Sequence, residues 1–487
     1  MGNTASVAGR DCFMAAVGGD PNLAAFRGDL LYEFRALPSY NLAIPVIPEV
    51  ITYPKNTTQV AEIVRCAVEE KYRVQAYSGG HSYGNYGLGG TDGHVVIDLK
   101  NFQQFSMDPD THIATVGAGT NLGDLQNRLL HAGGRAMAHG SCPQVGVGGH
   151  FTIGGLGLMS RQWGTSLDHV VEAEVVLANS SVVTASDTQN QDIFWAIKGA
   201  AASFGIVTQF KVRTHEVPKA AIQYTYTFSQ GDILDKVKLF QAWQSLVAKP
   251  NITRNFSTEL TIFQDGIVIM GSFLGTREEF QEFQHENGLP IESMGNVAYI
   301  TNWLALVANS AENYLISLAG GLLTSFYSKS LSFTADQMFT ERDLVTFFTY
   351  LDTAPKGTQT WWVIFDMEGG AINDVPMNAT SFVHRDAVMW MQSYSVVGFE
   401  PPGFIARRFL NRLHQVVLEN RPAGPMRAYP GYVDPYLKNG QMAYWGSNLE
   451  RLQSIKTLVD PRDIFHNPQS VPVNPITNRR DLQLQDV

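Results

Sequence analysis

A glycine-rich segment that contains one cysteine constrains the fold of this chain more than any other feature. Residues 140–157 read GSCPQVGVGGHFTIGGLG, with seven glycines in eighteen positions. Glycine disfavours helix and strand interiors, so we expect neither element here, but a loop that lies against something flat or anionic. Cys142 within this loop is either a small buried hydrophobic side chain or a reactive thiol.

A second glycine-rich segment, residues 77–84 (YSGGHSYG), directly follows a predicted strand. Glycines allow backbone N–H groups to approach an anion such as a pyrophosphate. The sequence has neither the GxGxxG fingerprint of dinucleotide-binding folds nor the GKS/GKT of a P-loop. Taken alone, His81 could be a surface histidine beside a turn. Together, the two segments favour a bound nucleotide cofactor.

The charge balance excludes one class of partner. The chain has 35 Lys and Arg against 45 Asp and Glu, which gives a net charge of −10. Nucleic-acid binding requires a basic face, so we expect no such partner. The longest apolar run, residues 315–327, is shorter than the about 18 residues that span a bilayer and is interrupted by Ser and Gly. We interpret it as core, and we expect no membrane partner and no metal site.

Cysteines and sequons indicate an oxidising, secretory environment. If Cys12 and Cys66 form a disulfide, Cys142 is left alone. Residues 1–6 fit the N-myristoylation pattern, but we interpret them as the start of a mature chain in which an initiator Met replaces a signal peptide. Five Asn-x-Ser/Thr sequons occur, at Asn56, Asn179, Asn251, Asn255 and Asn378.

Hydrophobic periodicity predicts an alternating α/β region before residue 216. The predicted strands are 73–78, 94–99, 113–116 and 205–212. The predicted helices are 58–70, 121–131 and 192–198, with a hairpin over 170–185 that turns at 179–181.

A different pattern follows and indicates an antiparallel sheet backed by helices. The predicted strands are 222–228, 256–263, 267–273 and 360–367. The predicted helices are 233–247, 276–285 and 402–419. The tail after 428, with a helix at 448–458, is expected to pack back on the first region.

With these motifs the chain resembles the berberine bridge enzyme-like branch of the vanillyl-alcohol oxidase superfamily, and within it the fungal glucooligosaccharide oxidases. Matching positions run from about residue 45 to 215 and from 429 to 475, and more weakly over 361–394. They include DIFWAIKG at 192–199 and DPRDIF at 460–465.

The resemblance implies an α+β fold with a two-part FAD-binding domain of the PCMH type. That domain would comprise residues 1–215, with its core at 45–215, and a returning segment at 429–487. Residues 216–428 would form the substrate domain.

The resemblance also implies a doubly bonded FAD. His81 would bond the flavin 8α-methyl, Cys142 would bond ring carbon 6, and the family disulfide would join Cys12 to Cys66. Further cofactor contacts would come from Ser78, Gly79, Gly80, Ser82, Tyr83, Ser141, Val145, Gly146, Gly148, Gly149, His150, Gly154, Gly155, Gly205, Ile206, Val207 and Gln469.

Two residues carry the implied catalysis. Residues 429–434 read YPGYVD and match a family Tyr-x-Asn-Tyr-x-Asp motif, which makes Tyr432 the general base, worth about 10²–10⁴-fold in rate. Gly431 stands where the family has Asn. Asp366 matches the carboxylate that accepts the proton of the tyrosine. The alternatives are a packed core tyrosine and a solvated or capping aspartate.

The implied substrate groove contains Tyr83, Trp362, Gln392 and Tyr394. Trp362 fits a sugar-stacking platform, although a tryptophan in a strand is commonly a core residue. Three residues depart from the polar and charged groove residues of the glucooligosaccharide oxidases: Ile364 loses a hydrogen bond, Glu259 reverses a charge, and Thr261 also differs. These departures favour a preferred sugar other than cello- or malto-oligosaccharides.

The sequence thus predicts a secreted, monomeric oxidase of reducing-end oligosaccharides. It would oxidise the anomeric carbon to a lactone, which hydrolyses to an aldonic acid. Val145, three positions after Cys142, resembles the oxidases and predicts that dioxygen is reduced to hydrogen peroxide. The alternatives are an oxidase of an alkaloid or phenolic secondary metabolite, the same sugar chemistry as a dehydrogenase, and a non-catalytic flavoprotein.

Overall fold

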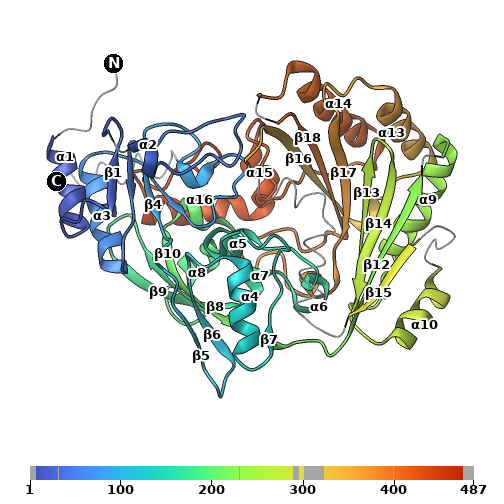
Figure 1. The fold of residues 1–487 in the computed structure, drawn as a ribbon, viewed down its shortest axis with the longest axis horizontal. Coiled ribbons are helices and arrows are strands. Elements are labelled where there is room, and N and C mark those ends of the chain that lie inside the picture. Colours follow the sequence, from blue (N-terminus) through green and yellow to red (C-terminus); the bar gives the residue numbers. More distant parts are fainter. Residues whose placement is uncertain are drawn as a thin grey trace.

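The computed structural model describes residues 7–30, 32–229, 231–288, 295–300, 323–398 and 400–474. These residues form two parts, each around a large hydrophobic core of its own (Figure 1). One core draws its buried side chains from the first 212 residues and from residues after 427, and the other from residues 222–417. This packing supports the predicted division at 215 and 428, which we retain as a proposal.

A small, mostly parallel sheet begins the first part. Its strand order is β1–β2–β4–β3, and only β1 runs antiparallel to its neighbour. Helix α3 (Thr57–Glu69) crosses from β2 to β3, and the Asn56 side chain caps its N-terminus. The glycine-rich segment 77–84 leaves the end of β3. The strands are β1 (Ala24–Phe26), β2 (Val50–Thr52), β3 (Val74–Tyr77) and β4 (Val95–Asp98).

A second, antiparallel sheet completes the first part, with the order β5–β6–β10–β8–β9. Its strands are β5 (Phe105–Met107), β6 (Ile113–Gly117), β8 (Val170–Val176), β9 (Val182–Ser186) and β10 (Ile206–Arg213). Helices α4 (Leu122–His131) and α8 (Gln191–Ala200) lie in the connections between its strands. The glycine-rich segment 140–157 follows α4 in the chain.

The described part of the tail packs against the first part, and the predicted return of the whole segment 429–487 stays a proposal. The amide of Val74 in β3 donates a hydrogen bond to the carbonyl of Ile464. Lys456, in α16 (Leu449–Val459), is fully buried and pairs with Asp460 at 2.6 Å. Its Nζ also donates to the carbonyl oxygens of Ser203 and Phe465. These bonds satisfy a buried charge that would otherwise be costly, and they tie the tail to the first part.

A seven-stranded antiparallel sheet forms the second part, with the order β15–β12–β14–β13–β17–β18–β16. Helices α9 (Ile233–Val247), α13 (Glu341–Thr353) and α14 (Phe404–Asn420) cover one face, on the outer side in Figure 1. The strands are β12 (Ala221–Ser229), β13 (Phe256–Phe263), β14 (Gly266–Phe273), β15 (Gly295–Ile300), β16 (Phe326–Phe333), β17 (Thr360–Met367) and β18 (Met389–Val396).

Strand β17 shows how this sheet divides core from site. Its Trp361, Val363 and Phe365 belong to the core under the helices. Because successive side chains of a strand point to opposite faces, Trp362, Ile364 and Asp366 project from the other face, toward the first part. The site residues therefore come from the face of the sheet that the helices leave free.

The structure confirms the predicted helices and strands to within three residues at each end. Most of residues 315–327 lies outside the described residues, but Phe326 and Tyr327 are buried in β16. The elements that the pattern missed include α1 (Val7–Ala16), β1, β2, β5, β15, β16, β18 and α13. Of these, β16 and β18 mix hydrophobic residues with polar ones, mainly serines, that are buried in the sheet, so polarity hid them.

The structure confirms the disulfide between Cys12 and Cys66, which joins α1 to α3, and leaves Cys142 unpaired.

The sequons are exposed, with Asn255 partly so, but glycosylation itself stays a prediction. Residues 1–6 lie outside the described residues. Among the described helices none is long and apolar enough to cross a bilayer, and the same part of the chain has no cluster of three His, Cys, Asp or Glu placed to hold a metal.

Candidate active site

A cavity of about 440 Å³ lies between the two parts. From the second part, strands β12, β13, β14, β17 and β18 line it, and from the first part both glycine loops and the tail line it. Most of the predicted site residues meet here. These are Ser78, Gly79, Gly80, His81, Ser82, Tyr83, Ser141, Cys142, Val145, Gly146, Gly148, Gly149, His150, Gly205, Ile206, Val207, Asp366, Gln392, Tyr394, Tyr432 and Gln469. Three predicted residues, Gly154, Gly155 and Trp362, lie outside the lining.

The two glycine loops pack backbone to backbone. A Cβ on Gly79 would lie 2.2 Å from the amide nitrogen of Gly146, and a Cβ on Gly146 would lie 2.1 Å from the amide nitrogen of Gly79. Real Cβ contacts are never this short, so neither position accepts a side chain. Ser78 reinforces the contact by donating from Oγ to the carbonyl of Ala118 at 2.6 Å. The result is a wall of bare backbone along the cavity.

The prediction that residues 140–157 form no helix is wrong. Helix α5 (Val147–Ile153) lies within them and includes two glycines. Tertiary packing overrides the low propensity, because Val147 and Phe151 are buried in the core of the first part. Thr152 Oγ1 adds hydrogen bonds to the carbonyls of Gly148 and Gly149. The rest of the segment is loop, as expected.

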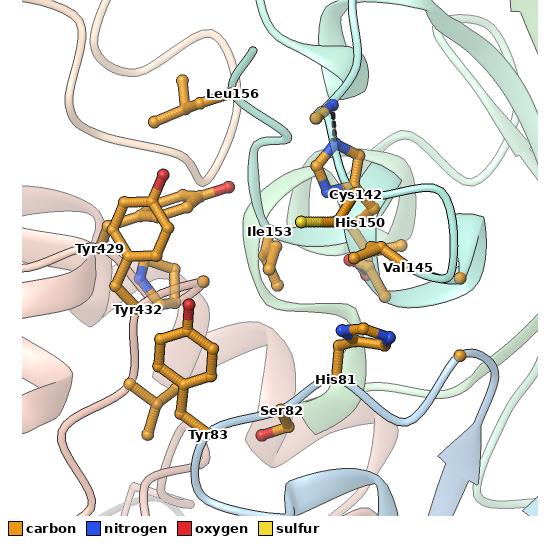
Figure 2. Close-up of a pocket in the computed structure, with 18 of the residues that line it drawn as sticks. His81, Ser82, Tyr83, Cys142, Val145, His150, Ile153, Leu156, Tyr429 and Tyr432 are labelled. Atoms are coloured by element: carbon orange, nitrogen blue, oxygen red, sulfur yellow. Dashed lines mark hydrogen bonds between the residues drawn. The ribbon is translucent and has the colours of Figure 1, made fainter. Parts of the chain in front are cut away.

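His81 and Cys142 lie on one side of the cavity, and Tyr429 and Tyr432 lie across it (Figure 2). Burial lowers the pKa of His81 to about 4, so its imidazole is neutral at physiological pH. Burial raises the pKa of Cys142, which keeps it a thiol at neutral pH. The thiolate, which is the reactive form of a cysteine, is therefore not the resting form of Cys142.

Tyr40 is a cavity residue that no motif signalled. Its ring lies 4.6 Å from the imidazole of His81, centroid to centroid, and 6.1 Å from the ring of Tyr83. It reaches the site from a loop of the first part about forty residues before His81 in the sequence. A lone aromatic in an irregular segment carries no pattern from which this position could be read.

Tyr432 sits among negative and aromatic groups. Burial, followed by the charge of Asp366, raises its pKa well above 10, in the direction that the sequence predicts for a carboxylate beside a phenol. Its ring lies 4.9 Å from that of Tyr429 and 6.4 Å from that of Tyr83. Among the described lining residues there is no Lys or Arg to stabilise a phenolate.

A chain of hydrogen bonds leads from Asp366 along the sheet. Gln392 donates from Nε2 to Asp366 Oδ2, and Tyr394 donates its hydroxyl to Gln392 Oε1 at 2.6 Å. The hydroxyls of Tyr394 and Tyr83 are 3.1 Å apart. Of the predicted catalytic pair, Tyr432 and Asp366 line the same cavity but have no direct hydrogen bond between them among the described contacts.

Trp362 is buried behind Tyr394 rather than exposed to the cavity. The two rings stack with centroids 5.2 Å apart, and Trp362 is 5% exposed. Ile364 belongs to the same small cluster and also lies outside the lining. The stacking role predicted for Trp362 stays untested, and in this structure Tyr394 is the ring that faces the cavity.

Several polar residues of the lining were not predicted as site residues. Because side chains alternate between the two faces of β12, Gln223 and Thr225 both point to the cavity wall. Glu368, which directly follows β17, also lines the cavity. Burial raises the pKa of Glu368 to about 8. The strand pattern places such residues on a face, but only the packing of the two parts shows that this face meets the glycine loops.

Comparison with known proteins identifies the chain. Residues 48–186 match the FAD binding domain family, and residues 428–472 match the berberine and berberine-like family. The FAD-linked oxidoreductase sorD of Penicillium rubens is 37% identical over 465 residues, which cover 95% of this chain and 98% of that protein.

Two solved structures show the same fold. Xylooligosaccharide oxidase from Myceliophthora thermophila C1, in complex with xylobiose, superposes with a TM-score of 0.87 at 31% identity, over 96% of this chain and 100% of that one. Glucooligosaccharide oxidase from Acremonium strictum, which carries a 6-S-cysteinyl, 8α-N1-histidyl FAD, gives 0.85 at 28% identity, over 95% and 98%.

The cavity fits the FAD that the family implies. Gly79 and Gly146 both line the cavity and hold the two glycine loops in backbone contact there, where a side chain on either would force the loops apart. Two side chains capable of bonding carbon, His81 and Cys142, face the same space. The chain belongs to the berberine bridge enzyme-like family of FAD-dependent oxidoreductases, with the fold of the vanillyl-alcohol oxidase superfamily.

Proposed function

We propose that this protein is an oxidase that holds FAD through bonds to His81 and Cys142 and oxidises the hydroxyl-bearing C1 of a reducing-end oligosaccharide. The supporting observation is the arrangement across the cavity, with the two bonding residues on one side and the Tyr432 phenol on the other (Figure 2). Bound FAD would supply the hydride acceptor and pass electrons to dioxygen.

His81 and Cys142 differ in readiness to bond the flavin. The buried imidazole is neutral and offers a free nitrogen lone pair. The Cys142 thiol must first lose a proton, because burial raises its pKa. We propose that a doubly bonded cofactor allows the cavity to stay open to a long substrate.

Tyr432 would take the hydroxyl proton of the substrate as the hydride leaves C1. Its pKa lies far above neutral, so it rests as a phenol and must pass its own proton on as it accepts another. Asp366, on the wall of the cavity that the seven-stranded sheet forms, is the carboxyl group that would accept that proton, held in place by Gln392. Gln223, Thr225 and Gln392 give that wall amide and hydroxyl groups that suit sugar hydroxyls.

Dioxygen use and secretion complete the proposal. Val145 lines the cavity close to Cys142, and the family resemblance implies that valine at this position favours an oxidase over a dehydrogenase. The disulfide between Cys12 and Cys66 favours an oxidising, extracytoplasmic environment.

Oxidation of a phenolic or other secondary metabolite is the second candidate. Two features favour it: Ile364 stands at a position where the resemblance implies a polar residue, and Trp362 is buried behind Tyr394. The relative sorD is named only as an FAD-linked oxidoreductase, at a higher identity than the oligosaccharide oxidases reported above.

A substrate panel separates the two candidates. Purified protein is mixed without oxygen with gluco-, xylo- and chitooligosaccharides and, separately, with phenolics and alkaloids, and flavin bleaching is followed at its visible band. Bleaching by a reducing sugar, followed by peroxide on admission of air, supports the proposal. Bleaching only by the aromatic compounds replaces it with the second candidate, and bleaching without peroxide indicates a dehydrogenase.

A further inference from the structure

We propose that Glu259 and Asp366 form one acid pair that shares a single proton, and that Glu259 is a positioning residue that sets when Asp366 can accept a proton from Tyr432. The inference rests on the proposed function for the roles of Tyr432 and Asp366. The pair itself rests on the geometry of two neighbouring strands.

The fold places the two carboxyl groups opposite each other. Strands β13 and β17 pair antiparallel, with Glu259 in register with Asp366 and Thr261 with Ile364. Directly opposed residues have Cβ atoms only about 5 Å apart. Both acids line the cavity; Glu259 is 7% exposed and Asp366 is partly buried. Water therefore screens their charges less than it would at a fully exposed surface.

Each acid accepts a hydrogen bond from a neutral side chain. Asp366 Oδ2 accepts from Gln392 Nε2, and Glu259 Oε1 accepts from Thr261 Oγ1 at 2.7 Å. Neither donor carries a positive charge, so neither balances a second negative charge on the pair. A single shared proton would remove one of the two charges and would let the protonated acid donate a hydrogen bond to the ionised one.

The surroundings favour retention of that proton. Among the groups that act on Asp366 are the carboxyl groups of Glu259 and Glu368, the amide of Gln392 and the phenols of Tyr83, Tyr394 and Tyr432. None of them is a cation, and the described cavity lining contains no Lys or Arg. Two ionised carboxylates side by side would repel strongly in such a site. Burial and the charge of Glu259 accordingly raise the pKa of Asp366.

This state suits a proton acceptor. In the proposed reaction the substrate O–H bond breaks as a new O–H bond forms on Tyr432, whose original proton passes to the ionised member of the pair, while the hydride passes to FAD. The pair then holds two protons and returns one to solvent before the next cycle. Without Glu259 a lone Asp366 would hold its charge at lower pH and would be a weaker base.

Infrared difference spectroscopy tests the pair without turnover. Wild type at neutral pH is expected to show one more protonated-carboxyl band than Glu259→Gln, in which the amide can donate to an ionised Asp366. Glu286→Gln, at an exposed helix position, is the matched control and should leave the band unchanged. If Glu259→Gln also leaves it unchanged, the shared proton is absent and the inference fails.

The pH profile of flavin reduction tests the consequence. Removal of the negative neighbour should move the acid limb of kcat/KM in Glu259→Gln to lower pH by about one pH unit or more. Thr261→Val removes the hydroxyl that donates to Glu259, and it should move the acid limb of kcat/KM to higher pH. This second variant keeps the test possible if Glu259→Gln does not fold. A uniform loss with no movement of the limb would overturn the inference. Absence of any reducing substrate would instead count against the proposed function, and the infrared band would still decide the pair.

Discussion

Gly79 and Gly146 meet so closely that a methyl group on either would collide with the amide nitrogen of the other. One glycine follows strand β3 and the other precedes helix α5, so this contact joins two segments that are remote in sequence. It fixes the position of His81, two residues after Gly79, relative to Cys142, four residues before Gly146. The spacing of the two residues that we propose to bond the flavin thus depends on two missing side chains.

Gly79→Ala should therefore lower flavin retention more than it lowers stability. The Cβ forces the loops apart and displaces His81 from Cys142, while the sheets remain intact. Flavin content per protein, read from the ratio of visible to protein absorbance, should fall several-fold. Gly403→Ala, where a Cβ meets nothing within 4 Å, should retain full flavin. Equal flavin content in both variants would contradict a role for the loop contact.

Tyr432→Phe should slow flavin reduction by about 10²–10⁴-fold, because the base is removed while the ring remains. Stopped-flow bleaching with the best substrate measures the effect. Tyr429→Phe is the matched control: its hydroxyl accepts a hydrogen bond from the amide of Gly155 at 2.7 Å, so its loss should cost stability of about 1 kcal/mol and leave the reduction rate nearly intact. Equal rate losses in both would remove Tyr432 from the proposed role.

Glu368→Gln should make the protein more stable at pH 8 than wild type. Burial raises the pKa of Glu368 from 4.5 to about 8, so the folded state keeps a proton that the unfolded state releases. The wild-type free energy of unfolding therefore falls as pH rises from about 4.5 to 8, by an amount on the order of a few kcal/mol. Urea unfolding at pH 4 and pH 8 should show no difference between the proteins at the lower pH and a difference at the higher.

The reverse order, with a larger difference at pH 4, would contradict burial of an unpaired Glu368 carboxyl. Glu286→Gln, at an exposed position, should show no such dependence.

Replacement of both Cys12 and Cys66 by Ser should lower the free energy of unfolding by about 2–4 kcal/mol. The bridge closes a sequence separation of 54 residues between α1 and α3, so its loss frees the N-terminal segment of the unfolded chain. Chemical denaturation measures the loss. An unchanged denaturation midpoint would show that the bridge contributes nothing to stability in solution.

Local patterns predicted the elements well because their causes are local. Helix α9 begins and ends at Ile233 and Val247, as its apolar spacing indicates. Helix α5 was missed because tertiary burial of Val147 and Phe151 outweighs two glycines.

In the candidate site, likewise, some residues can be recognised from the sequence and others only from the fold. Its glycine loops, His81 and Cys142 are recognisable from sequence, because their residue types are unusual. The pairing of Glu259 with Asp366, 107 positions later, is not, since the register of strands far apart in sequence is set by the whole sheet. Tyr40 and the burial of Trp362 likewise depend on how the two parts meet.

Acid denaturation of the purified protein tests the central proposal most directly. Neutral His81 and a deprotonated Cys142 would each bond the flavin, so the yellow colour should remain in the acid-precipitated pellet of wild type, of His81→Ala and of Cys142→Ala. Only the double variant should release FAD into the supernatant. Release of all cofactor from the wild-type protein on simple unfolding would contradict the account.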